Sequence, residues 1–222
     1  MRFRHDGINW ECYYRFSWLK AKLREHDDET LTILDVGGAT GADDLRVFMS
    51  GLSGHQWTTL DINESADITA DASQIPLPDL AFDIVVCLDM LEHVSSAQRL
   101  QVLSELIRVA RQKVYLVYPH FSQANESVEE YVCSYRLDDI FLKEHIENTL
   151  VNNTEVVDFL SLVSSNGLIS DFNLSYIDPT LPWGLTMLAG YVNPSSAYKI
   201  LSDKCSPDSY KRTCIDISIM QR

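Results

Sequence analysis

The 222 residues of the chain suffice for one α/β domain and are too few for two of ordinary size. Because 45% of them are hydrophobic, the chain can bury a core, and wholesale disorder is excluded. The 18 basic and 32 acidic residues give a net charge of −14, which disfavours nucleic acid and anionic membranes as partners.

Two further features of the sequence concern the cellular compartment of the protein. The N-terminus has no apolar stretch of the kind found in secretory signals, and no apolar run reaches the roughly 18 residues of a membrane-spanning helix. The five cysteines include no C-x-x-C pair, so we expect reduced thiols. Together these features predict a cytoplasmic protein that does not bind membranes.

The first part of the chain is expected to alternate between helices and strands. Aromatic and apolar residues recur at helical spacing within residues 1–30, which predicts an N-terminal helical cap that packs on the sheet or covers the cofactor cleft. Residues 31–118 form the expected cofactor-binding half. Its predicted strands are 31–36, 56–60, 68–69, 82–88 and 113–118, and its predicted helices are 42–50 and 97–110, the latter with Leu100, Leu103, Leu106, Ile107 and Ala110 on one face.

The second part of the chain, residues 119–222, is the expected substrate-side half. It is predicted to hold a loop with short helices at 120–150, a helix at 154–165 capped by Thr154, strands at 168–177 and 214–220, and a helical second half of 182–204. Alternating strands and helices of this kind indicate an α/β, Rossmann-like, seven-stranded, mostly parallel sheet with helices on both faces, in a single domain spanning 1–222.

A glycine-rich turn follows the first long strand and carries most of the functional information. The segment reads Asp35-Val36-Gly37-Gly38-Ala39-Thr40-Gly41, in which a strand runs into a turn that opens a helix. Glycines allow a ligand to approach the backbone closely, although a plain tight turn would have the same composition. Asp61 ends the second strand, where Rossmann-type folds offer an acid to ribose hydroxyls.

The spacing of the glycines separates two nucleotide classes. Aligned on Gly37, the dinucleotide pattern G-x-G-x-x-G finds Ala39 and Ala42 at its other glycine positions, so the pattern fails. This weakens, without removing, the alternative of a nicotinamide-dependent oxidoreductase. The segment instead fits Asp35-x-Gly37-x-Ala39-x-Gly41, with an acid beside the loop.

Four motifs in order resemble the class I S-adenosylmethionine-dependent methyltransferases over residues 31–118. They are the glycine turn, Asp61, the pair Asp71-Ala72 before the Pro76 loop, and the strand at 82–88. The resemblance implies S-adenosylmethionine as cofactor, with Asp35 near its methionine amino group, Asp61 on the ribose, and Asp71 on the adenine. The cofactor-binding residues that it implies are Asp35, Gly37, Gly38, Gly41, Asp61, Ile62, Asp71, Ala72 and Leu88.

Candidate catalytic residues follow the fourth and fifth strands. Glu92 and His93 come after the fourth strand, and His120 comes after the fifth, so all three are expected at the carboxyl edge of the sheet. A histidine there could serve as the general base of an O-methylation.

A metal site is the alternative role for the segment after the fourth strand. Asp89, Glu92 and His93 resemble the acid-x-x-Glu-His group of the ubiquinone-biosynthesis O-methyltransferases, which can hold a divalent metal. Relatives with this pair and no metal are also known, and we expect no metal here.

The acceptor is the least determined part of the prediction. The strand-four segment lacks the Asn- or Asp-Pro-Pro-aromatic sequence of nucleic-acid amino methyltransferases, so a small metabolite or a glycan hydroxyl is favoured. Arg15 on the N-terminal helix could bind an acidic substrate. A cofactor-binding partner subunit without catalysis stays open as an alternative, and the sequence leaves the oligomeric state open.

Overall fold

The computed structural model describes residues 4–5, 8–26, 28–38, 42–52, 54–135, 148, 150–179 and 210–220. Two short strands, β1 (Arg4–His5) and β2 (Ile8–Asn9), pair as a hairpin before the first helix, where the sequence predicted helix throughout. The long helix α1 (Trp10–Leu23) then continues into the single turn η1 (Arg24–His26).

The predicted seven-stranded sheet is confirmed. Its strands are β3 (Thr32–Val36), β4 (Gln56–Asp61), β5 (Ile68–Thr69), β6 (Phe82–Leu88), β7 (Ala110–Pro119), β8 (Ile169–Pro179) and β9 (Tyr210–Ile219). Their spatial order is β5-β4-β3-β6-β7-β9-β8, and β9 runs antiparallel to the other six strands. Strand order reverses at β3, which is the point where open α/β sheets bind ligands beyond their carboxyl ends.

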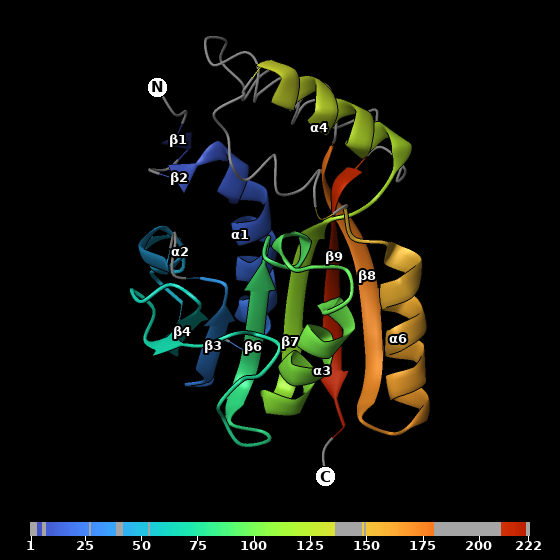
Figure 1. The fold of residues 1–222 in the computed structure, drawn as a ribbon. Helices are drawn as coiled ribbons and strands as arrows, with labels where there is room; N and C mark the ends of the chain where they lie inside the picture. Colours follow the sequence, from blue (N-terminus) through green and yellow to red (C-terminus); the bar gives the residue numbers. More distant parts are fainter. Residues whose placement is uncertain are drawn as a thin grey trace.

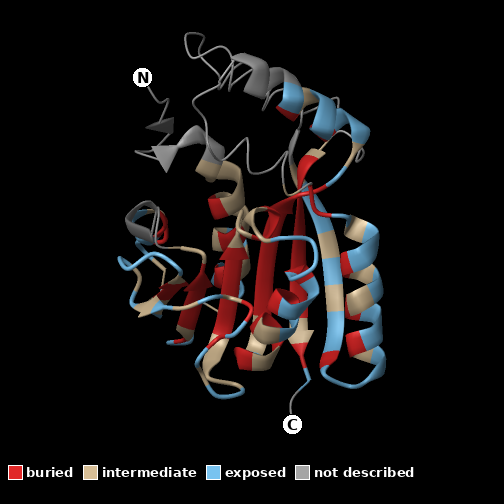
Figure 2. Cartoon of the chain, viewed as in Figure 1, coloured by how far each residue is buried: buried red, intermediate tan, exposed pale blue. Residues whose placement is uncertain are grey.

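The helices divide between the two faces of the sheet (Figure 1). Helices α3 (Arg99–Val109) and α6 (Asn153–Ser165) cover one face, whereas α1 and the short α2 (Ala42–Phe48) cover the other. Each face has its own apolar core, and the strands between them are the most deeply buried part of the molecule (Figure 2). This explains why the central strands appear in the sequence as continuous apolar runs.

The N-terminal helix packs on the sheet, as one of the two predictions had it. Phe16, Leu19 and Leu23 are buried in the core that α1 shares with Ile84 and Tyr115 of the sheet. Their spacing of three and four residues puts them on one face of the helix. The packed position fixes the polar residues of α1 relative to the strand ends.

Helix α4 (Gln123–Tyr135) lies across the carboxyl ends of the parallel strands (Figure 1). The sequence predicted only a loop with short helices here. Asn125 is buried and its Nδ2 donates to the carbonyl oxygens of His120 at 2.7 Å and Lys211 at 3.2 Å, which fastens the helix to β7 and β9. The predicted helix within 182–204 lies outside the described residues.

Two local predictions were wrong. Leu100 is 42% exposed, whereas the other four residues of the predicted apolar face of α3 are buried, and Val102 takes the place of Leu100 on that face. Helix α6 begins one residue early and is capped by Asn152, whose side chain accepts a hydrogen bond from the Thr154 N–H at 3.0 Å. Thr154 is therefore inside the helix and is not the cap.

The cap gives a simple test of the local structure. Asn152→Ala removes the acceptor for one N–H of the first turn and should lower the free energy of unfolding by about 1 kcal/mol. Urea denaturation of the two proteins would measure the difference. Asn152→Asp keeps the acceptor and should leave the stability within a few tenths of a kcal/mol, whereas equal losses in both variants would contradict the assigned role.

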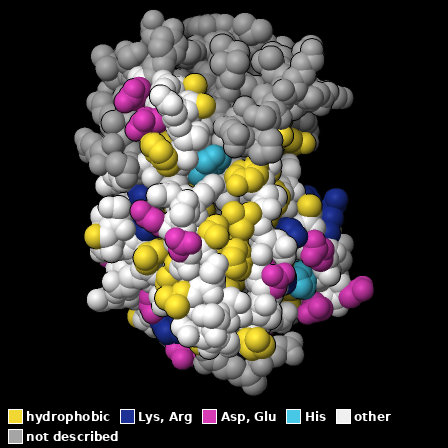
Figure 3. Space-filling view, turned by 90° about the vertical axis from the view of Figure 1, so that its right-hand side faces the viewer, with side chains coloured by type: hydrophobic (Ala, Val, Ile, Leu, Met, Phe, Trp, Pro, Cys, Tyr) yellow, Lys and Arg dark blue, Asp and Glu magenta, His cyan; other side chains and the backbone are white. Residues whose placement is uncertain are grey.

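Edge strand β8 and helix α6 form one side of the molecule (Figure 3). Hydrophobic side chains run down the middle of this side, with acidic side chains beside them. A pocket of about 240 Å³ opens between α3, α6 and the end of β9, lined by Leu80, Ile107, Phe159, Val163, Leu168 and Ile219 among others. It lies at the end of the sheet opposite the glycine turn and is not part of the candidate site. Within the described ranges, no helix is both long and apolar enough to traverse a bilayer.

Candidate active site

Three neighbouring strands bring the predicted residues to one edge of the sheet. Val36 at the end of β3 pairs with Leu60 of β4 and with Cys87 of β6. The residues that follow these three, Gly37, Asp61 and Leu88, therefore reach the same edge side by side. Strand register alone thus assembles the glycine turn, the second-strand acid and the end of the fourth predicted strand.

The first two glycines of the turn are required by the protein's own side chains. Gly37 has φ of +83°, and a Cβ at this position would lie 2.4 Å from Met90 Cγ. A Cβ at Gly38 would lie 2.1 Å from the Oδ2 of Asp35. Any larger residue would displace Asp35 or Met90, so the turn is shaped around both. Gly41 lies outside the described residues.

Asp35 is a buried carboxyl whose proton affinity is strongly altered. Burial raises its pKa to about 7, although Arg15 and Arg46 oppose this effect, and the negative charge of Asp61 adds to it. A carboxyl with this pKa lacks a sufficient cationic partner, because desolvation penalises the charged form. An ammonium group placed beside Asp35 would restore the ionised form.

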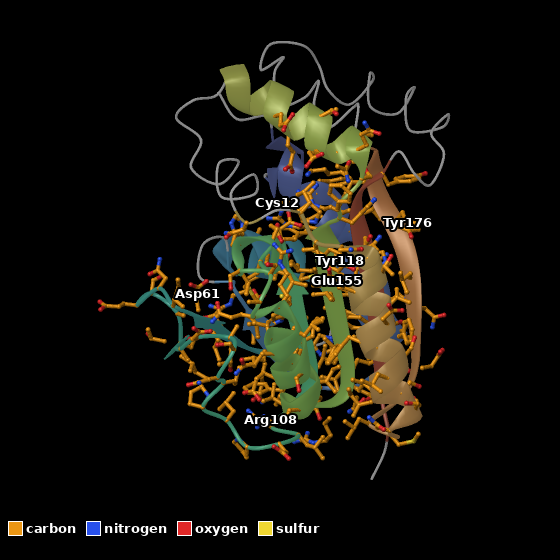
Figure 4. All side chains as sticks on the ribbon, turned by 45° about the vertical axis from the view of Figure 1, so that its right-hand side comes forward. Cys12, Asp61, Arg108, Tyr118, Glu155 and Tyr176 are labelled. Carbon is orange, nitrogen blue, oxygen red and sulfur yellow. The ribbon has the colours of Figure 1, made fainter. Side chains whose placement is uncertain are left out.

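Asp61 and Ile62 form the second part of the edge. The Asp61 carboxylate accepts a hydrogen bond from the Asn63 N–H at 2.9 Å, which orients it just beyond β4 (Figure 4). The next side chain, Ile62, is 77% exposed, which is unusual for a large apolar residue. An acid followed by an exposed apolar side chain suits a nucleoside, whose ribose needs an acceptor and whose base needs an apolar surface.

Asp71 and Ala72 lie in the loop after β5. The Asp71 carboxylate accepts a hydrogen bond from the Ser73 N–H at 2.7 Å, and this bond lowers its pKa. Asp71 is therefore ionised at neutral pH and exposed, whereas Ala72 is half-buried against the core. Both residues keep the positions that the resemblance implied, and their role in adenine binding stays a prediction.

A cluster of charged side chains lies just after β6. Asp89 has φ of +48°, which is uncommon for a residue with a side chain. Arg212 of β9 donates to its carboxylate from Nε at 2.9 and 3.0 Å and from Nη2 at 2.7 Å, and Arg15 of α1 contacts the same group. Two cations therefore share one carboxylate at the centre of the site.

The two predicted catalytic residues that follow β6 differ in solvent exposure. Leu91–His93 forms the short helix η2, in which Glu92 is fully buried and His93 half-buried. The pKa of Arg15 is raised against the effect of burial, chiefly by Asp89 and in smaller part by Glu92, whereas burial lowers the pKa of Arg99 although the charge of Glu92 opposes it. Glu92 therefore contributes negative charge from beneath the site. The carbonyl of His93 accepts from Asn148 Nδ2 at 3.1 Å.

Asp89, Glu92 and His93 are not arranged as metal ligands in the described structure. Among the described residues, no group of three or more His, Cys, Asp or Glu side chains is placed to hold a metal ion. The Asp89 carboxylate, which would have to be one ligand, is instead bound by the two arginines.

His120 lies at the carboxyl end of β7, as expected, but is only 5% exposed. Its ring packs edge-on against Tyr176 of β8 with the ring centroids 5.6 Å apart, and Tyr176 in turn stacks on Tyr210 of β9. A proton acceptor at this position is shielded by aromatic rings. Whether it acts as a base stays a prediction.

Sequence analysis missed Arg212, which completes the charged cluster. The sequence predicted the last strand to begin at residue 214, because the polar residues before it look unlike a buried strand. Their charges are matched by residues more than 80 positions away, Glu129 for Lys211 and Asp89 for Arg212. A pattern search along the chain has no means of finding such partners.

Comparisons with known proteins agree with this geometry. Residues 34–118 match the family described as a methyltransferase domain, and no curated protein matches the chain. The predicted enzyme class is thereby confirmed at the level of the domain, and the matched range coincides with the cofactor-binding half expected from the sequence.

Solved structures show the same fold. One is a SAM-dependent methyltransferase from Archaeoglobus fulgidus, with 16% identity and a TM-score of 0.58, covering 94% of this chain and 97% of that chain. Another is magnesium protoporphyrin IX methyltransferase from Synechocystis PCC 6803 with bound SAH, with 13% identity and a TM-score of 0.56, covering 92% of this chain and 82% of that one. At such identities the similarity establishes the fold alone, so the predicted likeness to the ubiquinone-biosynthesis branch stays a prediction.

Proposed function

We propose that the protein transfers a methyl group from S-adenosylmethionine to an oxygen of a small acceptor, either a metabolite or a sugar hydroxyl. The observation that carries the proposal is the pair of acids at neighbouring strand ends. Asp35 is buried against Gly38, and Asp61 is the last residue of β4, beside the exposed Ile62. The matched methyltransferase domain and the fold both support this cofactor.

The side chains present fit S-adenosylmethionine by their chemistry. A buried carboxyl with a pKa of about 7 suits the methionine ammonium group, which would stabilise its ionised form. Asp61 suits the ribose hydroxyls, and the exposed Ile62 suits one face of the adenine. The cofactor supplies an electrophilic methyl group on a sulfonium.

The contribution of the protein to such a reaction is chiefly positioning. Holding the acceptor oxygen in line with the methyl group can supply roughly 7–11 kcal/mol of the barrier. His93 and His120 are the candidates for taking the proton from a hydroxyl acceptor, and Glu92 would favour a protonated histidine nearby through its charge. A half-buried His93 has easier access to an acceptor than His120 behind Tyr176.

The rival functions fit less well. A nicotinamide dinucleotide would bring its pyrophosphate to the glycine turn, where Asp35 lies against Gly38 and offers a carboxyl group in place of a hydrogen-bond donor. A nucleic-acid acceptor is disfavoured by the net charge of −14. Cys12, Cys87 and Cys214 form no disulfide bond within the described residues, which supports a reducing, cytoplasmic location.

Calorimetric titration tests the proposal. We expect S-adenosylmethionine and S-adenosylhomocysteine to bind the wild-type chain and NAD not to bind. Asp61→Ala should weaken the adenosyl ligands roughly ten- to hundredfold, because it removes a charged acceptor of ribose hydroxyl hydrogen bonds. Glu64→Ala, an exposed acid in the same loop, is the matched control and should leave affinity unchanged.

Two results would contradict the proposal. Binding of NAD without the adenosyl ligands would favour the oxidoreductase. Binding of the adenosyl ligands together with no release of S-adenosylhomocysteine across a panel of hydroxylated metabolites and sugars would favour a partner subunit without catalysis. In that case, turnover of any complex it forms should be unaffected by Glu92→Gln.

A further inference from the structure

Helix α3 carries a polar stripe that faces the loop between β5 and β6. The stripe consists of Gln101, Glu105 and Arg108, whose spacing of four and three residues puts them on one side of the helix. The loop, residues 70–81, leads from the carboxyl edge of the sheet, where β5 ends, to the start of β6 at the opposite edge. The proposed chemistry gives this stripe no task.

Two side chains of the stripe bind the backbone of the loop directly. The Nε2 of Gln101 donates a hydrogen bond to the carbonyl oxygen of Ser73 at 2.9 Å. One helical turn later, the Oε2 of Glu105 accepts a hydrogen bond from the N–H of Ile75 at 2.8 Å. Successive turns of the helix therefore hold alternate residues of the loop.

Arg108, in the last turn of α3, is wholly engaged within the chain (Figure 4). Its Nη2 donates to the carbonyl of Ile75 at 2.9 Å, and its Nη1 donates to the carbonyl of Leu77 at 2.7 Å and to the Asp79 carboxylate at 3.0 Å. Its Nε and Nη2 also donate to the two carboxylate oxygens of Glu105, at 2.7 and 2.8 Å. A guanidinium has five N–H donors, and these bonds use all of them. Arg108 therefore holds the loop and has no donor left for a ligand.

The held segment begins at the residues predicted to bind adenine. The N–H of Ser73 donates to the Asp71 carboxylate at 2.7 Å, and the carbonyl of the same serine is bound by Gln101. Ser73 is buried, whereas Asp71 is exposed. The hydrogen bond from Ser73 orients the exposed carboxylate, so the direction of that carboxylate depends on α3 through Ser73.

We propose that Gln101, Glu105 and Arg108 are positioning residues that fix the Asp71 carboxylate and thereby set the preference of the site for adenine over other purines. The inference rests on the proposed function, because it takes S-adenosylmethionine as the cofactor and Asp71 as the acceptor for its adenine amino group. The three side chains act without touching the ligand. Hydrogen-bond recognition of one base needs an acceptor that is held in place by its own supporting contacts.

Two ligands that differ at one position of the base separate positioning from folding. S-Adenosylhomocysteine offers an amino donor to Asp71, whereas S-inosylhomocysteine offers a carbonyl oxygen, which cannot donate to a carboxylate. Calorimetry gives the ratio of the two affinities for wild type, Gln101→Ala, Glu105→Gln and Glu105→Ala. Ser104→Ala, which truncates an exposed residue of the same helix, is the control. Urea denaturation measures the stability of each variant separately.

The expected results follow from the contacts that each variant loses. Wild type and Ser104→Ala should prefer the adenine ligand roughly ten- to hundredfold. Glu105→Ala should lower this ratio about tenfold, chiefly by weakening S-adenosylhomocysteine. Glu105→Gln keeps an oxygen that can accept from Ile75 and should retain most of the ratio. Gln101→Ala should lower the ratio about threefold without loss of stability, because alanine favours an exposed helical position.

A purely structural stripe would give a different result, which overturns the proposal. Stability would then fall in Glu105→Ala while the ratio stays at the wild-type value, because both ligands lose affinity equally. If Glu105→Ala does not fold, an unchanged ratio in Gln101→Ala overturns the proposal by itself. Equal binding of the two ligands by wild type would do the same, since the site would then have no preference to set.

The proposed function can fail separately, in which case wild type binds neither ligand. Amide hydrogen exchange of Ser73, measured by NMR, then tests the positioning alone, because this N–H is bonded to Asp71. Gln101→Ala should accelerate the exchange about tenfold if α3 holds the carboxylate in place. Exchange as slow as in wild type and in Ser104→Ala would overturn the positioning role as well.

Discussion

The affinity for S-adenosylhomocysteine is expected to rise about tenfold between pH 6 and pH 8, and Asp35→Asn should abolish the rise. Burial raises the pKa of Asp35 to about 7, so a large share of the unliganded chain carries a neutral Asp35 at neutral pH. The methionine ammonium favours the ionised form, and each pH unit below the pKa therefore costs up to about tenfold in apparent affinity. Calorimetry at several pH values measures the slope.

5′-Methylthioadenosine provides the control for this prediction. It has no ammonium group, so its affinity should be independent of pH over the same range. Asp35→Asn should bind S-adenosylhomocysteine weakly at every pH, with the largest loss relative to wild type at pH 8. A wild-type affinity that does not change between pH 6 and pH 8 would contradict the assignment of the ammonium to Asp35.

The Asp35 carboxyl should also make the unliganded chain less stable as the pH rises, whereas the affinity for S-adenosylhomocysteine increases with pH. Because its pKa is raised in the folded chain, the folded state binds the proton more tightly than the unfolded chain does. Its favourable contribution is present below the ordinary value of 3.8 and is lost as the pH rises through about 7. Asp35→Asn should therefore stabilise the unliganded chain at pH 8, by at most about 4 kcal/mol. The variant would be more stable and bind less well, as expected at a functional site.

The parallel half of the fold could be predicted from the sequence because its signals are local. Strands such as β3 and β6 are buried on both faces, so nearly every residue in them is apolar, and the run is visible without knowing its neighbours. The order in which the strand-end acids appear then places the site. This is why Asp35 and Asp61 could be assigned to one edge before any coordinates were known.

The missed parts depend on contacts between residues far apart in sequence. Residues 210–213 at the start of β9 are polar, yet Lys211 and Arg212 are buried because α4 and the β6 loop supply their counter-charges. Helix α4 was predicted as a loop for the reciprocal reason, since Glu129 looks like a solvated side chain until Lys211 is placed beside it. The raised pKa of Asp35 likewise results from the burial of its side chain, and residue spacing in the sequence does not predict that burial.

The buried pair that joins α4 to β9 should produce the largest stability effect in the molecule. The side chains of Glu129 and Lys211 are 2% and 1% exposed and form an ion pair. Glu129→Ala leaves the Lys211 ammonium buried without its counter-charge, and such losses cost about 3–5 kcal/mol. For a chain of this size the melting temperature should fall by roughly 10 °C. Urea denaturation at neutral pH measures the free energy directly.

Two controls separate burial from charge pairing as the cause. Glu25→Ala removes an acid that pairs with Lys22 at the surface, 3.4 Å away, and should cost less than about 1 kcal/mol. The double variant Glu129→Leu with Lys211→Met replaces the pair by apolar side chains of similar size and should recover most of the loss, because it removes the desolvation cost of both charges. If the double variant were as unstable as Glu129→Ala, the loss would come from packing rather than from an isolated charge. If the double variant recovers the lost stability, apolar packing also holds α4 over the carboxyl edge of the sheet. Helix α4 should then keep its position in a chain that lacks both charges.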